Sequence, residues 1–181
     1  VVLNPAELLK QTRDSRRIQE LSTLNKAMEL VRISDPNLSL GSSSIVYVSL
    51  ADTFSNCSNL SLPSLPSGWS YKCVTQANLR KVDGSGWIPI NFASSSFGSP
   101  LAILPIDPIN NASSGLYYTY VTGGSWKLTG LFESEKQAKN MVSDGGPDNG
   151  LYEIGSNLEL ANFIRGLVGY WKFDEGSGSI A

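Results

Sequence analysis

The sequence predicts an α+β fold in which one long helix packs on a small antiparallel sheet. Two observations lead to this prediction. The run from Pro5 to about Ile33 consists mostly of good helix formers and contains no glycine. The second half of the chain alternates aromatic and β-branched residues around a two-glycine turn at Gly123–Gly124. A chain of 181 residues with 41% apolar content is long enough for one ordinary domain of this class.

The composition argues against several classes of function. The chain has no histidine, so a Ser-His-Asp triad and a histidine-ligated zinc site are both impossible. Its 14 basic and 16 acidic residues give a net charge of -2, and no extended basic field is available for nucleic acid. We therefore expect neither an enzyme active site nor a nucleic-acid partner.

The predicted helix begins near Pro5 and ends before the Asp35–Asn37 turn. An apolar stripe recurs along it at steps of three and four residues: Ile18, Leu21, Leu24, Met28 and Val31. Its first half carries most of its charges: Lys10, Arg13, Asp14, Arg16, Arg17 and Glu20. The helix should be roughly 40 Å long, more than a small domain needs. Its first half should therefore project, with most charges solvated and a partner surface as the alternative.

A Ser-rich connection follows the helix and contains few strand signals. Ile45–Leu50 is β-branched and aromatic, which predicts a short strand. Ala77–Arg80 is expected to form a short helical turn. Trp87–Phe92 is expected to be an edge segment, because Pro89 has no N–H to donate to a neighbouring strand.

The two cysteines, Cys57 and Cys73, lie inside this connection. A disulfide between them would stabilise the loop by roughly 3 kcal/mol and would indicate an oxidising, exported location. The alternative is that they are two unrelated small core residues.

The sheet is predicted from the last third of the chain. Leu116–Val121 alternates its faces, and a return strand begins at Trp126 after the glycine turn. Glu133–Met141 is expected to form a short exposed helix, and Leu151–Ile154 a third strand. Four aromatic residues are expected on the faces of this sheet: Tyr117, Tyr118, Tyr120 and Trp126.

Two stretches carry a resemblance to a known family. The run "VVLNPAELLKQTRDSRRIQELSTLNKAMEL" resembles the exposed half of the N-terminal helix of type IV pilins and type II secretion pseudopilins. The run "LPIDPINN", followed by "YYTY" and "GGSWKLTGLFE", resembles the sheet of the major pseudopilin type, in which a Leu-Pro-x-Asp-Pro turn leads into the hairpin. The similarity covers most of residues 1–155.

The resemblance implies a pilin-like fold over residues 1–160. A helical spine would occupy residues 1–33, a long disulfide-tied αβ loop residues 34–115, and the sheet with its C-terminal loop residues 116–155. It also implies an exported filament subunit that polymerises with copies of itself. An apolar segment upstream of Val1, with a methylated N-terminus in the parent protein, would anchor it in the inner membrane before assembly.

On this reading the helix makes the contacts with neighbouring subunits. The residues expected to do so are Leu8, Leu9, Arg13, Arg16, Arg17, Ile18 and Leu21. Half of the sheet aromatics would pack on the helix and half would face a neighbour. Plain core packing is the alternative for each of them.

A Gly-rich loop near the C-terminus is a candidate calcium site. Its possible ligands are Asp144, Asp148 and Asn149, with Glu153 nearby, because calcium prefers carboxylate and carbonyl oxygens on flexible turns. Major pseudopilins carry a calcium site in a similarly placed loop. The same residue types also form ordinary turns, and that alternative stays open. No other cofactor is expected.

The last stretch, "GLVGYWKFDEGSGSIA" from Gly166 to Ala181, resembles the opening strand of a laminin-G-like, concanavalin A-type domain. Residues 161–181 would then be a linker and the start of a second, lectin-like domain. Asp174 and Glu175 are expected to lie in a solvated turn. This yields an alternative function, a cell-surface adhesin in which the pilin-like part is a stalk for a sugar- or surface-binding domain.

Overall fold

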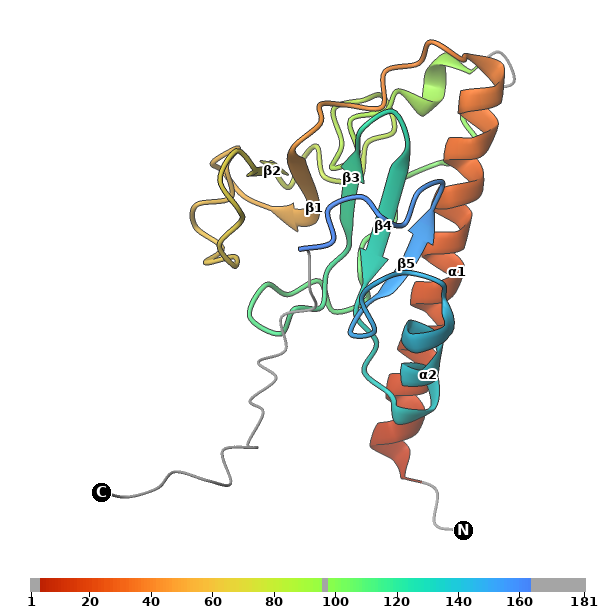
Figure 1. Ribbon diagram of the computed structural model, residues 1–181, viewed down its shortest axis with the longest axis vertical. Coiled ribbons are helices and arrows are strands. Elements are labelled where there is room, and N and C mark those ends of the chain that lie inside the picture. Colours follow the sequence, from red (N-terminus) through yellow and green to blue (C-terminus); the bar gives the residue numbers. More distant parts are fainter. Residues whose placement is uncertain (1–3, 96–97, 164–181) are drawn as a thin grey trace.

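The computed structural model describes residues 4–95 and 98–163 of the chain. Its elements follow in the order α1 (Pro5–Ser34), β1 (Ile45–Ala51), β2 (Ser70–Val74), the short 3₁₀ helix η1 (Phe92–Ser94), β3 (Thr119–Thr122), β4 (Trp126–Gly130), α2 (Glu135–Ser143) and β5 (Tyr152–Gly155). The long helix α1 stands along one side of the sheet, and α2 packs beside its N-terminal half (Figure 1). The α+β class predicted from the sequence is confirmed.

The bounds of α1 follow from its end signals. The side chain of Asn4 accepts a hydrogen bond from the backbone N–H of Ala6, and Pro5 fits the first turn because its missing N–H is not needed there. The helix ends at Ser34, one residue before Asp35 adopts an extended conformation. The predicted helix is therefore confirmed. No helix in the described ranges is both long enough and apolar enough to cross a membrane.

The sheet has five strands in the order β2-β1-β3-β4-β5. Strands β1, β3, β4 and β5 pair antiparallel, whereas β2 pairs parallel with β1. The prediction of a small antiparallel sheet within residues 116–155 was thus too narrow. Two strands come from the predicted αβ loop. β1 confirms the strand predicted at Ile45–Leu50. β2, Ser-Tyr-Lys-Cys-Val, was not predicted, because this short stretch lies in a segment rich in Ser, Pro and Gly, although its Tyr and Val favour a strand.

Two strand predictions differ from the structure in detail. The first hairpin strand begins at Thr119 rather than Leu116. The predicted edge segment Trp87–Phe92 is not a strand and makes only an isolated bridge between Asp83 and Asn91. Its apolar side chains are buried, and the indole N–H of Trp87 donates to the carbonyl of Pro105 at 2.9 Å. The large apolar side chains of this segment pack in the core, and the prediction of an edge segment of the sheet is therefore wrong.

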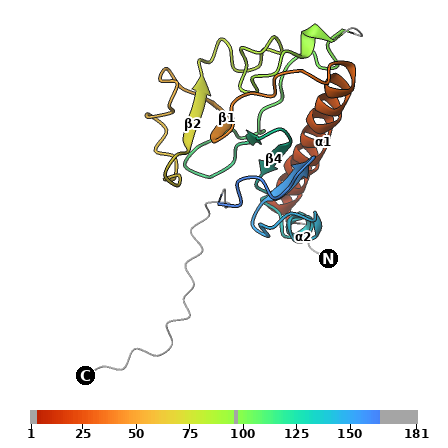
Figure 2. The same cartoon turned by 45° about the horizontal axis from the view of Figure 1, so that its top comes forward.

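The core lies between α1 and one face of the sheet. The apolar stripe of α1 is buried there, with Leu21, Leu24 and Met28 fully covered by the sheet and the connecting loops. Gly130 allows the close approach of α1 to β4, because a Cβ at that position would lie 3.0 Å from the Leu21 side chain. The disulfide-tied loop packs on the opposite face of the sheet, on the side of the molecule away from α1 (Figure 2).

Candidate functional site

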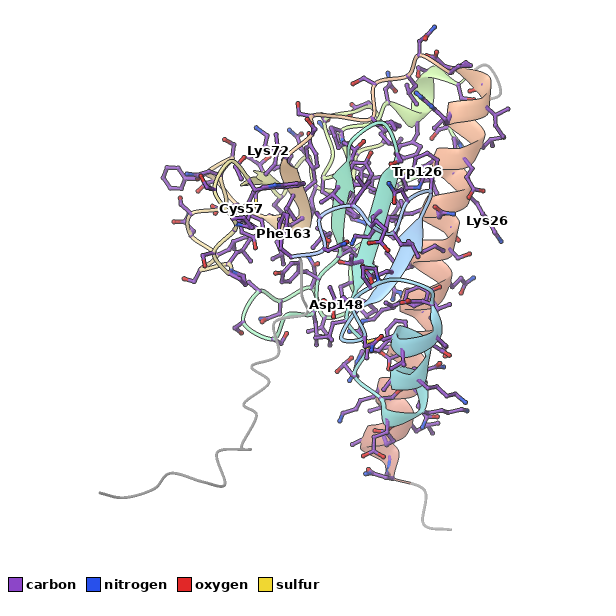
Figure 3. The ribbon with its side chains drawn as sticks, viewed as in Figure 1. Lys26, Cys57, Lys72, Trp126, Asp148 and Phe163 are labelled. Carbon is purple, nitrogen blue, oxygen red and sulfur yellow. A yellow bond between two sulfur atoms is a disulfide. The ribbon has the colours of Figure 1, made fainter. Side chains whose placement is uncertain are left out.

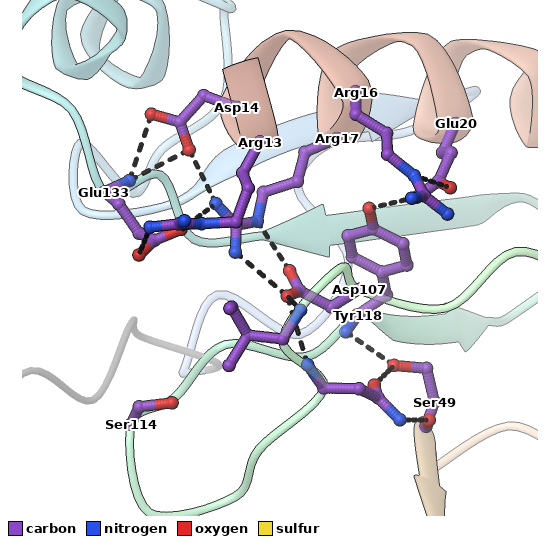
Figure 4. Close-up of polar contacts among 12 residues, drawn as sticks. Arg13, Asp14, Arg16, Arg17, Glu20, Ser49, Asp107, Ser114, Tyr118 and Glu133 are labelled. Atoms are coloured by element: carbon purple, nitrogen blue, oxygen red, sulfur yellow. Dashed lines mark hydrogen bonds and ion pairs between the residues drawn. The ribbon is translucent and has the colours of Figure 1, made fainter. Parts of the chain in front are cut away.

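A buried cluster of charges joins the N-terminal half of α1 to the loops beyond the sheet (Figure 4). Arg17 lies at its centre with a fully buried side chain. Its guanidinium donates to Asp107 twice, from Nε to Oδ2 at 2.6 Å and from Nη2 to Oδ1 at 2.9 Å. Its Nη1 donates to Asp14 at 2.7 Å and to Glu133 at 2.6 Å. One side chain therefore connects three separate segments of the chain.

The partners of Arg17 are themselves held by backbone groups. Asp107 accepts hydrogen bonds from the N–H groups of Ile109 and Asn110, which fixes the Leu-Pro-x-Asp-Pro turn. Asp14 accepts from the N–H groups of Glu133 and Ser134, just before α2 begins. The cluster thus fixes both the turn and the start of α2 against α1.

The electrostatics of the cluster keep its charges in place. Burial lowers the pKa of Arg17, but hydrogen bonds to Asp107, Glu133 and Asp14 outweigh this and raise it overall. The bidentate pair with Arg13, at 2.7 and 2.8 Å, lowers the pKa of Glu133, against the opposing effect of burial. The raised pKa of Arg17 and the lowered pKa of Glu133 keep this ion pair charged near neutral pH, which suits a structural contact between α1 and the segment before α2.

A second polar contact lies one turn further along α1. The Tyr118 hydroxyl donates to Glu20 at 2.7 Å, and Glu20 also accepts from Arg16 at 2.8 Å. Burial, followed by the bond to Glu20, raises the pKa of Tyr118, so the phenol stays protonated. This contact ties Tyr118, the residue just before β3, to the middle of α1.

The candidate assembly residues on α1 fall into two groups. Leu8 and Leu9 point outward and are 53% and 60% exposed, and Arg16 is exposed as well. Arg13 is partly buried by its pairing with Glu133. The remaining residues face the interior of the subunit: Arg17, Ile18 and Leu21. The charges of the first half of α1 are therefore only partly solvated, contrary to the simple expectation of a projecting polar half-helix.

The four sheet aromatics lie mostly inside the subunit. Tyr118, Tyr120 and Trp126 are buried between the sheet and α1, and their polar atoms bond to Glu20, the Leu40 carbonyl and Asn25. Tyr117 is half-buried on the opposite face of the sheet, against the disulfide loop cluster. Their placement follows the core-packing alternative.

The candidate calcium ligands lie in one loop but are largely engaged with the chain itself. Asp144 accepts from the N–H groups of Gly146 and Glu153. Glu153 accepts from the Asp148 N–H and from the ammonium of Lys127 at 2.8 Å. Asn149 is exposed, and one oxygen of Asp148 is buried without a hydrogen-bond partner. In the described part of the chain no group of three or more acidic, cysteine or histidine side chains is placed to hold a metal ion.

Lys127 explains how this loop is held. Its side chain and that of Glu153 are both fully buried, and its ammonium also donates to the Leu158 carbonyl at 3.0 Å. Gly146 must lack a side chain, since a Cβ there would collide with the Glu153 carboxylate. In this arrangement the ammonium of Lys127 occupies the position next to the Glu153 carboxylate, where a cation would otherwise bind.

The ion pairs of Arg17 with Asp107 and Glu133 were not predicted from the sequence. The partners of Arg17 are 90 and 116 residues away, and no local pattern pairs them. One signal was present, however. Asp14 and Arg17 continue the apolar stripe of Leu21, Leu24 and Met28 at the same steps of three and four residues. This spacing places them on the buried face of α1, so their burial could have been predicted from the sequence.

A disulfide joins Cys57 and Cys73, with their Cα atoms 5.3 Å apart, as predicted. The laminin-G-like resemblance lies in residues 166–181, outside the described residues, so the second domain stays a prediction. No protein-family model matches this chain, and neither a curated protein nor a solved structure matches it.

Proposed function

We propose that this protein is a structural subunit of a type IV pilus-like or type II secretion pseudopilus filament, assembled through its N-terminal helix. The observation that carries the proposal is the outward face of α1. Exposed apolar side chains occupy both ends of this face, Leu8 and Leu9 at the start and Leu30 and Ile33 near the end, at 53%, 60%, 42% and 78% exposure. Exposed apolar side chains that gather on one face of a helix are a typical feature of protein–protein contact surfaces.

The exposed residues between these ends are a mixture of uncharged polar and charged side chains. The exposed polar residues without charge on this stretch are Thr12, Ser15, Gln19 and Thr23. Lys26 points away from the body of the subunit (Figure 3). Three charged residues are also exposed on this stretch, Arg16, Lys26 and Glu29, so a neighbour that covers this face must pair them or leave them at the rim.

The inner face supports the same role. The lock around Arg17 holds the N-terminal half of α1 to the subunit through Asp107 and Glu133. A rigid connection of this kind lets a helix transmit force between a filament core and the globular part. The Leu-Pro-x-Asp-Pro turn, which carried the family resemblance, supplies the central partner of the lock.

Assembly of the full-length protein in its native host tests the proposal. Leu8→Glu combined with Leu9→Glu places two charges on the outward face and should abolish filaments seen by electron microscopy, with the melting temperature of the purified subunit unchanged. Phe54→Glu is the matched control, because Phe54 is 57% exposed on the disulfide loop. Normal filaments from the double variant would refute the assembly role of this face.

Export to an oxidising compartment is part of the same proposal. The disulfide between Cys57 and Cys73 favours it, because such bonds persist mainly outside the reducing cytosol. We propose a structural role without catalysis, and self-association as the main partnership. Two further features are suggested by the sequence resemblances alone. They are membrane anchoring before assembly and carbohydrate binding by a second domain.

A further inference from the structure

A surface depression of about 370 Å³ lies in the loop between β1 and β2. It is formed by residues between Asn56 and Tyr71, on the side of the molecule away from α1 (Figure 3). This places it far from the outward face of α1, so a ligand there would not compete with the proposed assembly contacts. Its volume is within the range of small-molecule sites.

The lining is neutral and combines aromatic rings with hydrogen-bonding groups. Trp69 and Tyr71 supply the rings. The amide and hydroxyl groups come from Asn56, Ser58, Ser61, Ser64 and Ser70. No lining residue is acidic or basic. An ionised ligand would find no opposite charge here, whereas a neutral polyhydroxylated one would find both a flat apolar surface and many donors and acceptors.

These polar groups are left unpaired by the protein. Within the described ranges, the indole N–H of Trp69, the phenol of Tyr71 and the lining amide and hydroxyls make no hydrogen bond to the chain. Elsewhere the same residue types are satisfied, as in Trp126 donating to Asn25 at 2.8 Å and Trp87 donating to Pro105. Burial raises the pKa of Tyr71, so its hydroxyl remains a donor. The Asn and Ser side chains of the lining are exposed to solvent, so a ligand in the depression can bond to them in place of water.

The walls of the depression are fixed in place. The disulfide of Cys57 closes the loop, and Asp52 holds its start by accepting bonds from the Phe54 and Asn59 N–H groups at 3.1 and 3.0 Å. The Trp69 ring meets Phe163 edge to face, with 4.6 Å between ring centroids. A rigid, pre-formed site loses less conformational entropy on binding.

We propose that this depression binds a neutral saccharide. The C–H face of a pyranose ring would pack on an aromatic ring of the lining, while its hydroxyls bond to the Ser and Asn side chains and the indole N–H. This inference goes beyond the structural role proposed above, since it assigns a ligand to the globular part itself. The site does not depend on a second domain.

Two-dimensional NMR of the ¹⁵N-labelled protein tests the proposal directly. Lactose, cellobiose and N,N′-diacetylchitobiose are titrated separately to about 10 mM, which reveals dissociation constants in the millimolar range. At least one of them should shift the Trp69 indole resonance saturably and leave those of Trp87 and Trp126 in place. Trp69→Ala should abolish the saturable shifts in the loop, and Phe54→Ala should retain them.

A second variant guards against misfolding of Trp69→Ala. Asn56→Ala combined with Ser58→Ala removes two hydrogen-bonding groups and should weaken binding about tenfold, with an unchanged spectrum of the free protein. The absence of a saturable shift with all three sugars would overturn the proposal. So would equal binding by Trp69→Ala, or stronger binding of glucose 6-phosphate at the same resonances.

Discussion

Arg17 of α1 and Asp107 of the loop before β3 form a fully buried bidentate ion pair, although 90 residues separate them in the chain. Two charges removed from water are stable only when each satisfies the other, and here the geometry does so with bonds of 2.6 and 2.9 Å. The pair fixes where the long helix meets the globular part. Its removal is therefore the sharpest test of how the subunit is held together.

Asp107→Ala should lower the free energy of unfolding by about 3–5 kcal/mol, because it leaves the Arg17 guanidinium buried with part of its charge uncompensated. Urea denaturation followed by tryptophan fluorescence measures this. Arg16→Ala is the control, since Arg16 has a 58% exposed side chain in its pair with Glu20 and should cost about 0–1 kcal/mol. Equal losses in the two variants would show that the buried pair contributes nothing special.

Glu133 should make stability depend on pH in the acid range. Its pKa in the folded protein lies below the ordinary value of 4.5, chiefly because Arg13 bonds to its carboxylate. The folded state then binds the proton less readily than the unfolded state, so this contribution is complete above pH 4.5 and is lost as the pH falls through the lowered pKa.

Unfolding free energies measured between neutral pH and the acid range test this dependence. Glu133→Gln should flatten the acid limb of the curve and leave the shape near neutral pH unchanged. An acid limb of the same steepness in the variant would assign the effect to other carboxylates.

The disulfide should account for a large part of the stability of the β1–β2 loop. Replacing both Cys57 and Cys73 by alanine opens a link between residues 16 positions apart and should cost roughly 3 kcal/mol. Thermal unfolding measures the loss. In the unreduced wild type, thiol titration under denaturing conditions should detect no free thiol; two reactive thiols in freshly exported protein would contradict the bond.

Calcium should leave the melting temperature unchanged relative to chelator, because Lys127 already neutralises Glu153 and both Asp144 oxygens bond to the backbone. Differential scanning fluorimetry in millimolar calcium and in chelator compares the two conditions. A rise in melting temperature that disappears in Asp144→Ala and in Asp148→Ala would instead establish the loop as a calcium site, since ligand binding to the folded state alone raises stability.

Several features of this protein were determined by local sequence. The stripe from Leu21 to Val31 fixed which side of α1 is buried, because spacing of three and four residues places side chains on one helix face. Asn4 and the Asp35 region set the ends of α1 through capping and turn chemistry. The β3–β4 hairpin turns at Gly123–Gly124, where Gly124 adopts a φ of +86° that other residues rarely take. The disulfide was also correctly predicted.

Other features were decided only in the tertiary structure. β2 pairs with β1 in parallel, and this short segment becomes a strand because the neighbouring strand and the disulfide at Cys73 hold it there. Trp87 is buried in the core, because burying its large apolar ring stabilises the fold more than placing it at the edge of the sheet would. The lock around Arg17 and the pair of Lys127 with Glu153 depend on partners distant in sequence. A charged side chain can be buried only where the fold brings an oppositely charged group next to it. When that group is distant in the sequence, no local sequence pattern predicts the pair.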